Sequence, residues 1–304
     1  MNTAPFISIV IPAYNEEKNI EKSIDSLRAQ DYPGDRYEII VADNNSTDKT
    51  REILKKLNVK YFVETRKGRP SVLNLGIKNS KGEMIVFTDA DCIPEPNWLT
   101  NAVKGFSEPL VGCVAGEIKI LGPEGNFLVE FQKRKRYFSP ELLRNRQYPY
   151  LPAGCGANLA FRRDVFDKIG DFDEDCVRSE DTDICFRMQM QTDYKINYAF
   201  DAVIYHKCET SLWRFLKQRF NVGRGQVELR NKYKDRFKKT TIKQKYWTFH
   251  SLFIKGVKGV RFWFKGFSNK EYKERSYDEF VELAMSTSEM LGRAYWRFFV
   301  KSGK

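Results

Sequence analysis

Two aspartates one residue apart offer the clearest chemistry in the sequence. Asp89 and Asp91 follow an apolar run at residues 84–87, which predicts a strand buried in a sheet. Ligands bind at the carboxyl ends of the strands in open α/β sheets, where a buried strand turns toward water. Two carboxylates at this spacing suit Mg²⁺ or Mn²⁺. A solvated turn rich in Asp would explain the same residues without a ligand, so the neighbouring elements must decide.

Strands that alternate with helices surround this pair. Apolar runs predict strands at 6–11, 37–42 and 59–63, and apolar positions at helical spacing follow the first two. Such alternation indicates βαβ units and a parallel sheet, which brings the strand ends to one edge. The polar clusters at these ends comprise residues 12–16, 43–48 and 89–91.

After Asp91 the pattern becomes less regular. Residues 98–106 predict a helix, and residues 111–120 predict a strand interrupted by glycines. Three acids, at positions 180, 181 and 183, stand in the first turn of a predicted helix. Acids in that turn are favoured by the helix dipole, so stability alone would account for one or two of them.

Taken in chain order, the polar clusters resemble the signature of the family 2 glycosyltransferases, inverting enzymes of the GT-A fold that use nucleotide sugars. The resemblance covers residues 6 to about 225 and implies an α/β fold with a Rossmann-like, mostly parallel sheet flanked by helices. We therefore expect a catalytic domain at 1–230 and a basic, aromatic-rich helical extension at 231–304. The matching segments are 8–16, 41–50, 73–77, 89–91, 156–158, 170–174 and 180–183.

The resemblance assigns the first half of the chain to a nucleotide sugar, with UDP as the expected nucleotide. Asp91 would bind Mn²⁺ or Mg²⁺ together with Asp89, which leans more toward the ribose. His206 is either a third metal ligand or a packed side chain. A turn-capping role for Asp43 and a solvated basic turn around residue 67 remain open. The implied donor-binding residues are Pro12, Ala13, Tyr14, Glu16, Asp43, Lys67, Arg69, Asp89, Asp91, Arg219 and Arg224.

The second half of the chain is expected to carry the acceptor chemistry. An inverting transfer needs one base to deprotonate the acceptor hydroxyl, and the resemblance gives that role to Asp181. Glu180 is the second candidate catalytic residue and would orient the acceptor. Asp183 either contacts the acceptor or caps its helix. The implied acceptor-binding residues are Gly156, Asn158, Glu180 and Asp183.

Residues 218–225 depart from the Gln-x-x-Arg-Trp motif that processive synthases of this family carry. No uncharged apolar stretch in the sequence approaches the roughly 20 residues of a transmembrane helix. Both features favour transfer of a single sugar over polymer synthesis. Arg219 and Arg224 would cover the diphosphate as a closing lid, and the acceptor would serve polysaccharide, glycolipid or lipid-linked glycan synthesis.

The net charge of +12 is unevenly distributed. Residues 211–304 carry 23 Lys and Arg against 8 Asp and Glu, which leaves the rest of the chain slightly acidic. Basic residues alternate with aromatic ones at 249–267, a pattern typical of a helix on an anionic membrane surface. A helix packed on the catalytic domain or on a homodimer partner is the alternative. With no signal peptide apparent, we expect a cytoplasmic protein, peripheral at the inner face of the cell membrane.

Two other classes of protein fit the sequence less well. A nucleotidyltransferase acting on sugar phosphates would need a glycine-rich phosphate loop after the first strand, and residues 12–15 read Pro-Ala-Tyr-Asn. A nucleic-acid-binding protein would use the basic C-terminal region but leave the acids unexplained, so we expect no nucleic acid. The six cysteines are scattered without a CxxC pair, which indicates free thiols in a reducing compartment.

Overall fold

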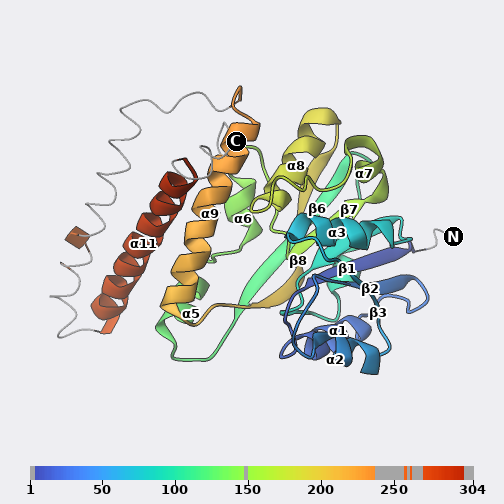
Figure 1. Cartoon of the computed structure of the whole chain (residues 1–304), viewed down its shortest axis with the longest axis horizontal. Coiled ribbons are helices and arrows are strands. Elements are labelled where there is room, and N and C mark those ends of the chain that lie inside the picture. Colours follow the sequence, from blue (N-terminus) through green and yellow to red (C-terminus); the bar gives the residue numbers. More distant parts are fainter. Residues whose placement is uncertain (1–3, 147–149, 237–256, 259–260, 262–269, 298–304) are drawn as a thin grey trace. The chain divides into compact units, whose positions relative to one another are not determined.

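The computed structural model describes residues 4–146, 150–236, 257–258, 261 and 270–297. Its main feature is an eight-stranded sheet with the strand order β3-β2-β1-β4-β7-β6-β8-β5 (Figure 1). The strands are β1 (Ile7–Ala13), β2 (Tyr37–Asp43), β3 (Lys60–Val63), β4 (Met84–Thr88), β5 (Cys92–Pro94), β6 (Val111–Leu121), β7 (Asn158–Arg162) and β8 (Lys195–Lys207).

The first four strands are parallel and confirm the predicted βαβ units. The other half of the sheet is mixed. β7 runs antiparallel to both β4 and β6, β5 runs antiparallel to β8, and β6 and β8 are parallel. The antiparallel insertion of β7 has no signal in the sequence pattern. It joins the regular first half of the sheet to the less regular second half.

Helices cover both faces of the sheet, as the continuous apolar strands require. Successive strand residues point to opposite faces, so Ile9 and Val10 belong to different cores. Ile9 packs with apolar residues of α1, α2 and α4, while Val10 packs with those of α3, α7 and α8. The helices of this part are α1 (Ile20–Arg28), α2 (Thr50–Lys56), α3 (Arg69–Lys78), α4 (Trp98–Lys104), α6 (Pro140–Arg144), α7 (Arg163–Ile169) and α8 (Glu180–Gln191).

The chain divides into two compact units. The first comprises residues 1–121 and 136–207 and holds the sheet, and the second comprises residues 122–135 and 208–304. In this second unit, the helices with described bounds are α5 (Phe127–Arg134), α9 (Leu212–Lys232) and α11 (Lys270–Tyr295). The domain boundary expected at residue 230 falls inside α9, which is one continuous helix.

Close packing of α9 on α11 holds the second unit together and confirms the expected helical C-terminal region. A Cβ added at Gly223 would lie 2.1 Å from the Glu289 carbonyl oxygen, and one at Gly292 would lie 1.9 Å from that of Phe220. Only glycine allows backbones to approach this closely. Arg219 on α9 also donates from Nε to Glu289 Oε1 at 2.9 Å.

The predicted contact of the C-terminal region with a membrane is not tested by the structure and stays a prediction. Most of the basic, aromatic stretch at 249–267 lies outside the described residues. Among the residues that the structure does describe, no helix combines the length and hydropathy that a membrane span requires.

The side chain of Asn158, at the start of β7, forms hydrogen bonds with backbone groups beside an irregularity in the sheet. The pairing of β6 with β8 shifts register between Gly116 and Glu117. Beside this shift, Asn158 Nδ2 donates to the carbonyl oxygens of Glu117 and Ala202, both at 2.9 Å. Asn158 Oδ1 accepts from Trp98 Nε1 at 2.8 Å, and the residue is 3% exposed. The structure therefore does not support acceptor contact by Asn158, because its amide is used inside the core.

We predict that Asn158→Ala strongly destabilises the fold. The substitution leaves the Trp98 indole N–H and two carbonyl oxygens buried without these partners, at a cost of about 1–3 kcal/mol for each unsatisfied group. Urea unfolding should show a loss of about 3 kcal/mol or more. The matched control is Asn97→Ala at the exposed N-cap of α4, whose side chain makes no capping bond, and should change the free energy of unfolding by about 0.5 kcal/mol or less. Equal effects of the two substitutions would contradict the structural role.

Candidate active site

The loop after β2 is organised by the buried carboxylate of Asp43, which is fully inaccessible to solvent. Its Oδ2 accepts from the backbone N–H of Ser46 at 3.0 Å, and its Oδ1 accepts from the Ser46 hydroxyl. Arg51 Nε lies 3.8 Å from Oδ2. These contacts give Asp43 the turn-capping role that the sequence left open, and they fix the shape of the loop at this strand end.

The loop after β1 is tied to the loop after β2. Asn15 adopts a left-handed conformation with a φ of 56°, which an Asn tolerates better than most residues. Its Oδ1 accepts from the Thr47 N–H at 2.8 Å, and its own N–H donates to Ser46 Oγ at 2.9 Å. Tyr14, just before this turn, is 59% exposed. Hydrogen bonds therefore hold the two loops, residues 14–16 and 44–48, together as one ledge, and the ring of Tyr14 is exposed beside this ledge.

Arg69 lies between the acids of β4 and those of α8. Gly68, with a φ of 130°, turns the chain into α3, and Arg69 is the first residue of that helix. Its Nη2 lies 2.6 Å from Asp89 Oδ1, and its Nε lies 2.9 Å from Glu180 Oε1. Burial lowers the pKa of Arg69, but the two carboxylates outweigh it and raise that pKa overall. Arg69 therefore stays charged and joins the end of β4 to the start of α8, two segments that lie far apart in the sequence.

Glu180 and Asp181 open α8 beside this arginine. Burial and the neighbouring charge of Asp181 raise the pKa of Glu180 to about 8, although Arg69 acts against the rise. Asp181 Oδ2 accepts from the Gly156 N–H at 3.1 Å, and its Oδ1 accepts from the Thr182 N–H at 2.6 Å. Gly156 leaves room for this arrangement, since a Cβ there would come within 3.2 Å of Arg69 Nη2.

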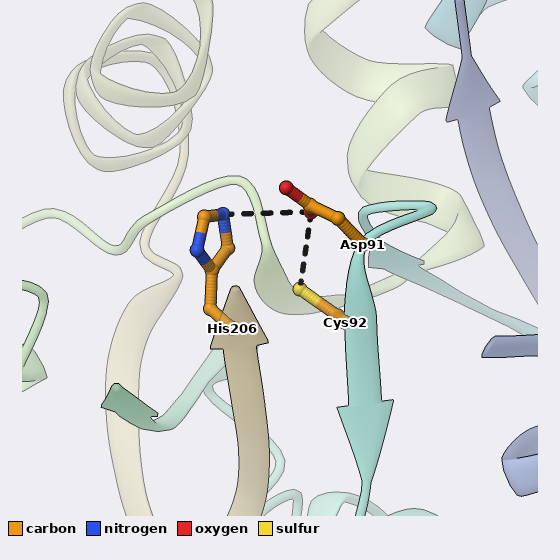
Figure 2. A group of neighbouring side chains, drawn as sticks. All are labelled: Asp91, Cys92 and His206. Atoms are coloured by element: carbon orange, nitrogen blue, oxygen red, sulfur yellow. Dashed lines mark hydrogen bonds and ion pairs between the residues drawn. The ribbon is translucent and has the colours of Figure 1, made fainter. Parts of the chain in front are cut away.

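A group of possible metal ligands lies at the end of β4 and across to β8 (Figure 2). His206 Nε2 lies 3.6 Å from Asp91 Oδ1 and 4.0 Å from Asp89 Oδ2. Burial raises the pKa of Asp91; His206 opposes that rise and Asp89 adds to it. A carboxylate in such surroundings is stabilised by a cation. Carboxylate and imidazole donors suit Mn²⁺, so these residues fit a divalent ion.

Glu16 extends this acidic group toward the first loop. Its Oε2 accepts from Asn19 Nδ2 at 2.6 Å. Burial raises the pKa of Glu16, and the charges of Asp91 and Asp89 contribute to the increase. Glu16 therefore lies close enough to the two aspartates to interact with their charges, and its place in the donor site stays a prediction. Pro12 and Ala13 belong to β1 next to this loop.

The remaining predicted residues have surroundings of their own. Asp183 is fully buried, and its Oδ2 accepts from Arg187 Nε at 2.9 Å, so the structure supports a structural role for it rather than acceptor contact. Lys67 has an exposed side chain just before α3. Arg219 and Arg224 belong to the helical unit, where Arg219 pairs with Glu289 and Arg224 stacks 5.1 Å from the Tyr295 ring centroid.

Two features of the site are absent from the sequence predictions. Arg69 was expected to contact phosphate or base, and its bridge to Glu180 depends on a contact between residues 111 positions apart. Cys92 was treated as a scattered thiol, although its position directly after Asp91 places it beside the metal ligands. The direction of the Cys92 side chain is determined by β5, and this three-residue strand is too short to be predicted from a hydrophobic pattern.

Comparison with known proteins identifies the family to which the chain belongs. Residues 8–170 match the family described as Glycosyl transferase family 2. Glycosyltransferase AglE of Haloferax volcanii is 30% identical over 235 residues, which cover 75% of each chain. A relative in Methanococcus voltae is 28% identical, over 72% of each chain. It is named dolichyl N-acetyl-alpha-D-glucosaminyl phosphate 3-beta-D-2,3-diacetamido-2,3-dideoxy-beta-D-glucuronosyltransferase.

Among solved structures, the mannosyltransferase PcManGT of Pyrobaculum calidifontis, in complex with GDP-Man and Mn²⁺, superposes with a TM-score of 0.64. The two are 22% identical, and the match covers 95% of this chain and 88% of that one. The fold is therefore that of the GT-A glycosyltransferases. The chain belongs to glycosyl transferase family 2 and is a glycosyltransferase.

We predict that the raised pKa of Glu180 makes the folded state less stable, relative to the unfolded chain, as the pH rises. The folded protein keeps this proton up to about pH 8, whereas the unfolded chain releases it near the ordinary pKa of 4.5. The stabilisation is complete below pH 4.5 and is lost progressively toward pH 8. Because Gln cannot ionise, Glu180→Gln should gain stability relative to the wild type across this range. Denaturant unfolding in EDTA, in a series of buffers, measures the difference, and a pH-independent difference would contradict the prediction.

Proposed function

We propose that the protein transfers a single sugar from a nucleoside-diphosphate sugar to an acceptor hydroxyl with inversion of configuration and with the help of a divalent ion. The observation that carries the proposal is the convergence of Asp89, Asp91, Glu180 and Asp181 around one half-buried arginine, Arg69. Acids from a strand end meet acids from a helix start. A donor-side pair and an acceptor-side pair in one site suit a reaction between two bound substrates.

On the donor side, the ledge formed by the loops after β1 and β2 would receive the nucleotide. Tyr14 would stack on the base or ribose, while Asp43 shapes the loop from within. Asp91 and His206, with Asp89 nearby, would hold Mn²⁺ or Mg²⁺. When bound, such an ion supplies positive charge to the leaving diphosphate. PcManGT, whose structure contains GDP-Man and Mn²⁺, supports this reading of the donor side.

On the acceptor side, we assign the general base to Asp181. Hydrogen bonds from Gly156 and Thr182 fix both of its oxygens, so the carboxylate is held in one orientation. It would take the proton of the acceptor hydroxyl while that oxygen bonds to the anomeric carbon and the bond to the diphosphate breaks. Glu180, with a pKa of about 8, keeps its proton at neutral pH and is the poorer base.

The donor nucleotide and the acceptor class are narrower proposals. The resemblance of the sequence favours UDP, whereas PcManGT binds a GDP-linked sugar. The Methanococcus voltae relative is named for a dolichyl-phosphate-linked acceptor, which supports a lipid-linked acceptor here. Offering UDP- and GDP-linked sugars with free and lipid-phosphate-linked saccharides decides both questions. Transfer from GDP-sugars alone, or to free saccharides alone, would contradict these narrower proposals.

We predict that Asp181→Asn lowers the rate of transfer by about 10²–10⁴-fold, the usual contribution of a positioned general base. Donor affinity in Mn²⁺ should stay within about twofold of the wild type, because the donor is held by other residues. Single-turnover transfer assays and donor titrations measure the two quantities separately. Asp175→Asn, an exposed acid of the same half of the chain, is the control and should leave both unchanged.

Retained transfer in Asp181→Asn would assign the base to another residue, with Glu180 as the first candidate. Loss of donor binding would mean that Asp181 serves the nucleotide instead. Either result would contradict the assignment made here.

A further inference from the structure

Cys92 places a thiol in contact with the proposed metal ligands. Its Sγ lies 3.9 Å from Asp91 Oδ1, which itself lies 3.6 Å from His206 Nε2. All three donor atoms lie within 4.8 Å of one another. Figure 2 shows the three side chains directed toward a common point, with the sulfur below the carboxylate.

The sheet dictates this arrangement. β5 and β8 are antiparallel, and Cys92 is the direct partner of His206 in their register. Directly opposed residues present their side chains on the same face of a sheet, with Cβ atoms about 4.5–5.5 Å apart. Asp91 immediately precedes the strand and turns its carboxylate to the same point. The thiol therefore faces the ligands because of the backbone pairing, and a change of rotamer is not needed to bring it near.

The spacing of the three donor atoms is close to that of a tetrahedral thiolate site. Bond lengths of about 2.3 Å to sulfur and about 2.0–2.1 Å to nitrogen and oxygen correspond to ligand separations of about 3.3–3.6 Å at a tetrahedral centre. The separations from Asp91 Oδ1, 3.6 Å to His206 Nε2 and 3.9 Å to Cys92 Sγ, exceed this by a few tenths of an ångström, and the sulfur lies within 4.8 Å of the imidazole donor. Small side-chain movements would bring all three donors onto one cation.

We propose that Asp91, Cys92 and His206 form a mixed oxygen, sulfur and nitrogen site for a thiophilic divalent cation, with Zn²⁺ as the cation of choice. Binding breaks the S–H bond, releases the proton to solvent and forms a sulfur–metal bond. Thiolate and imidazole ligands favour Zn²⁺ and Co²⁺ over the harder Mn²⁺ and Mg²⁺. The site shares Asp91 and His206 with the proposed transferase, so Zn²⁺ competes there with Mn²⁺.

As a consequence of this proposal, the identity of the bound metal ion would determine whether the donor can bind. Cys92 is fully buried, so only a cation already held by Asp91 and His206 reaches its sulfur. A cation bound in this way occupies the Asp91 oxygen from which the donor diphosphate would be approached. Zn²⁺ at this position therefore acts as an inhibitor of Mn²⁺-supported donor binding.

Titration of the full-length protein with Co²⁺, without nucleotide, tests the proposal. The wild type should develop a sulfur-to-cobalt charge-transfer absorption in the near ultraviolet. In Cys92→Ser this absorption should disappear and the affinity for Co²⁺ should fall by about tenfold or more. The matched control is Cys155→Ser, since Cys155 is a more accessible thiol outside the ligand group, and it should retain the absorption.

Co²⁺ binding to the wild type without a sulfur absorption would overturn the proposal, as would an absorption that persists in Cys92→Ser. If Cys92→Ser does not fold, the cadmium NMR shift of the Cd²⁺-loaded wild type reports sulfur ligation without any substitution. Donor binding by the wild type in Mn²⁺ is measured in parallel. Normal donor binding without sulfur ligation refutes this inference alone, whereas absent donor binding refutes the proposed function.

Discussion

The pairing of one half-buried arginine, Arg69, with carboxylates from two directions is the interaction on which the rest of the site depends. Asp89, Asp91, Glu180 and Asp181 would repel one another if they were brought together without a cation. Arg69 contacts Asp89 and Glu180 directly and offsets part of that repulsion. Its fork of N–H donors suits two carboxylates at once, which an ammonium group would match less well. Burial, and after it the charge of Asp181, nevertheless keep the pKa of Glu180 above its ordinary value.

The fold supplies the geometry that this pairing requires. Parallel strands bring the loops after β1, β2 and β4 to one edge, and β7 leads from the Gly156 turn back into the sheet. Arg69 enters from the start of α3 and Glu180 from the start of α8, so two helix ends meet the strand ends. The possible metal ligands come from the loop after β4 and from β8, two strands that are not adjacent in the sheet. A charged site is thus built from segments whose positions the apolar core determines.

The sequence was most informative where the structure depends on local patterns. Apolar runs located β1, β2 and β4, the acids after β4 identified Asp91 as a candidate, and the family resemblance identified Asp181. Asn158 was misjudged because its partners become available only through a register shift between β6 and β8. Asp183 could be judged only with Arg187 in place, one helical turn away. The direction of the Cys92 side chain depends on the pairing of β5 with β8. A strand of three residues is too short for its sequence pattern to predict that pairing.

Calorimetric titration of the donor sugar nucleotide into the wild type and into Asp91→Ala tests the central claim most directly. The wild type should bind the donor more tightly in Mn²⁺ than in EDTA. Asp91→Ala should lose this difference and keep the thermal unfolding of the wild type, since Asp91 lies at a strand end outside the core. Asp25→Ala on the exposed side of α1 should behave like the wild type. Equal, Mn²⁺-dependent donor binding by Asp91→Ala and the wild type would contradict the account.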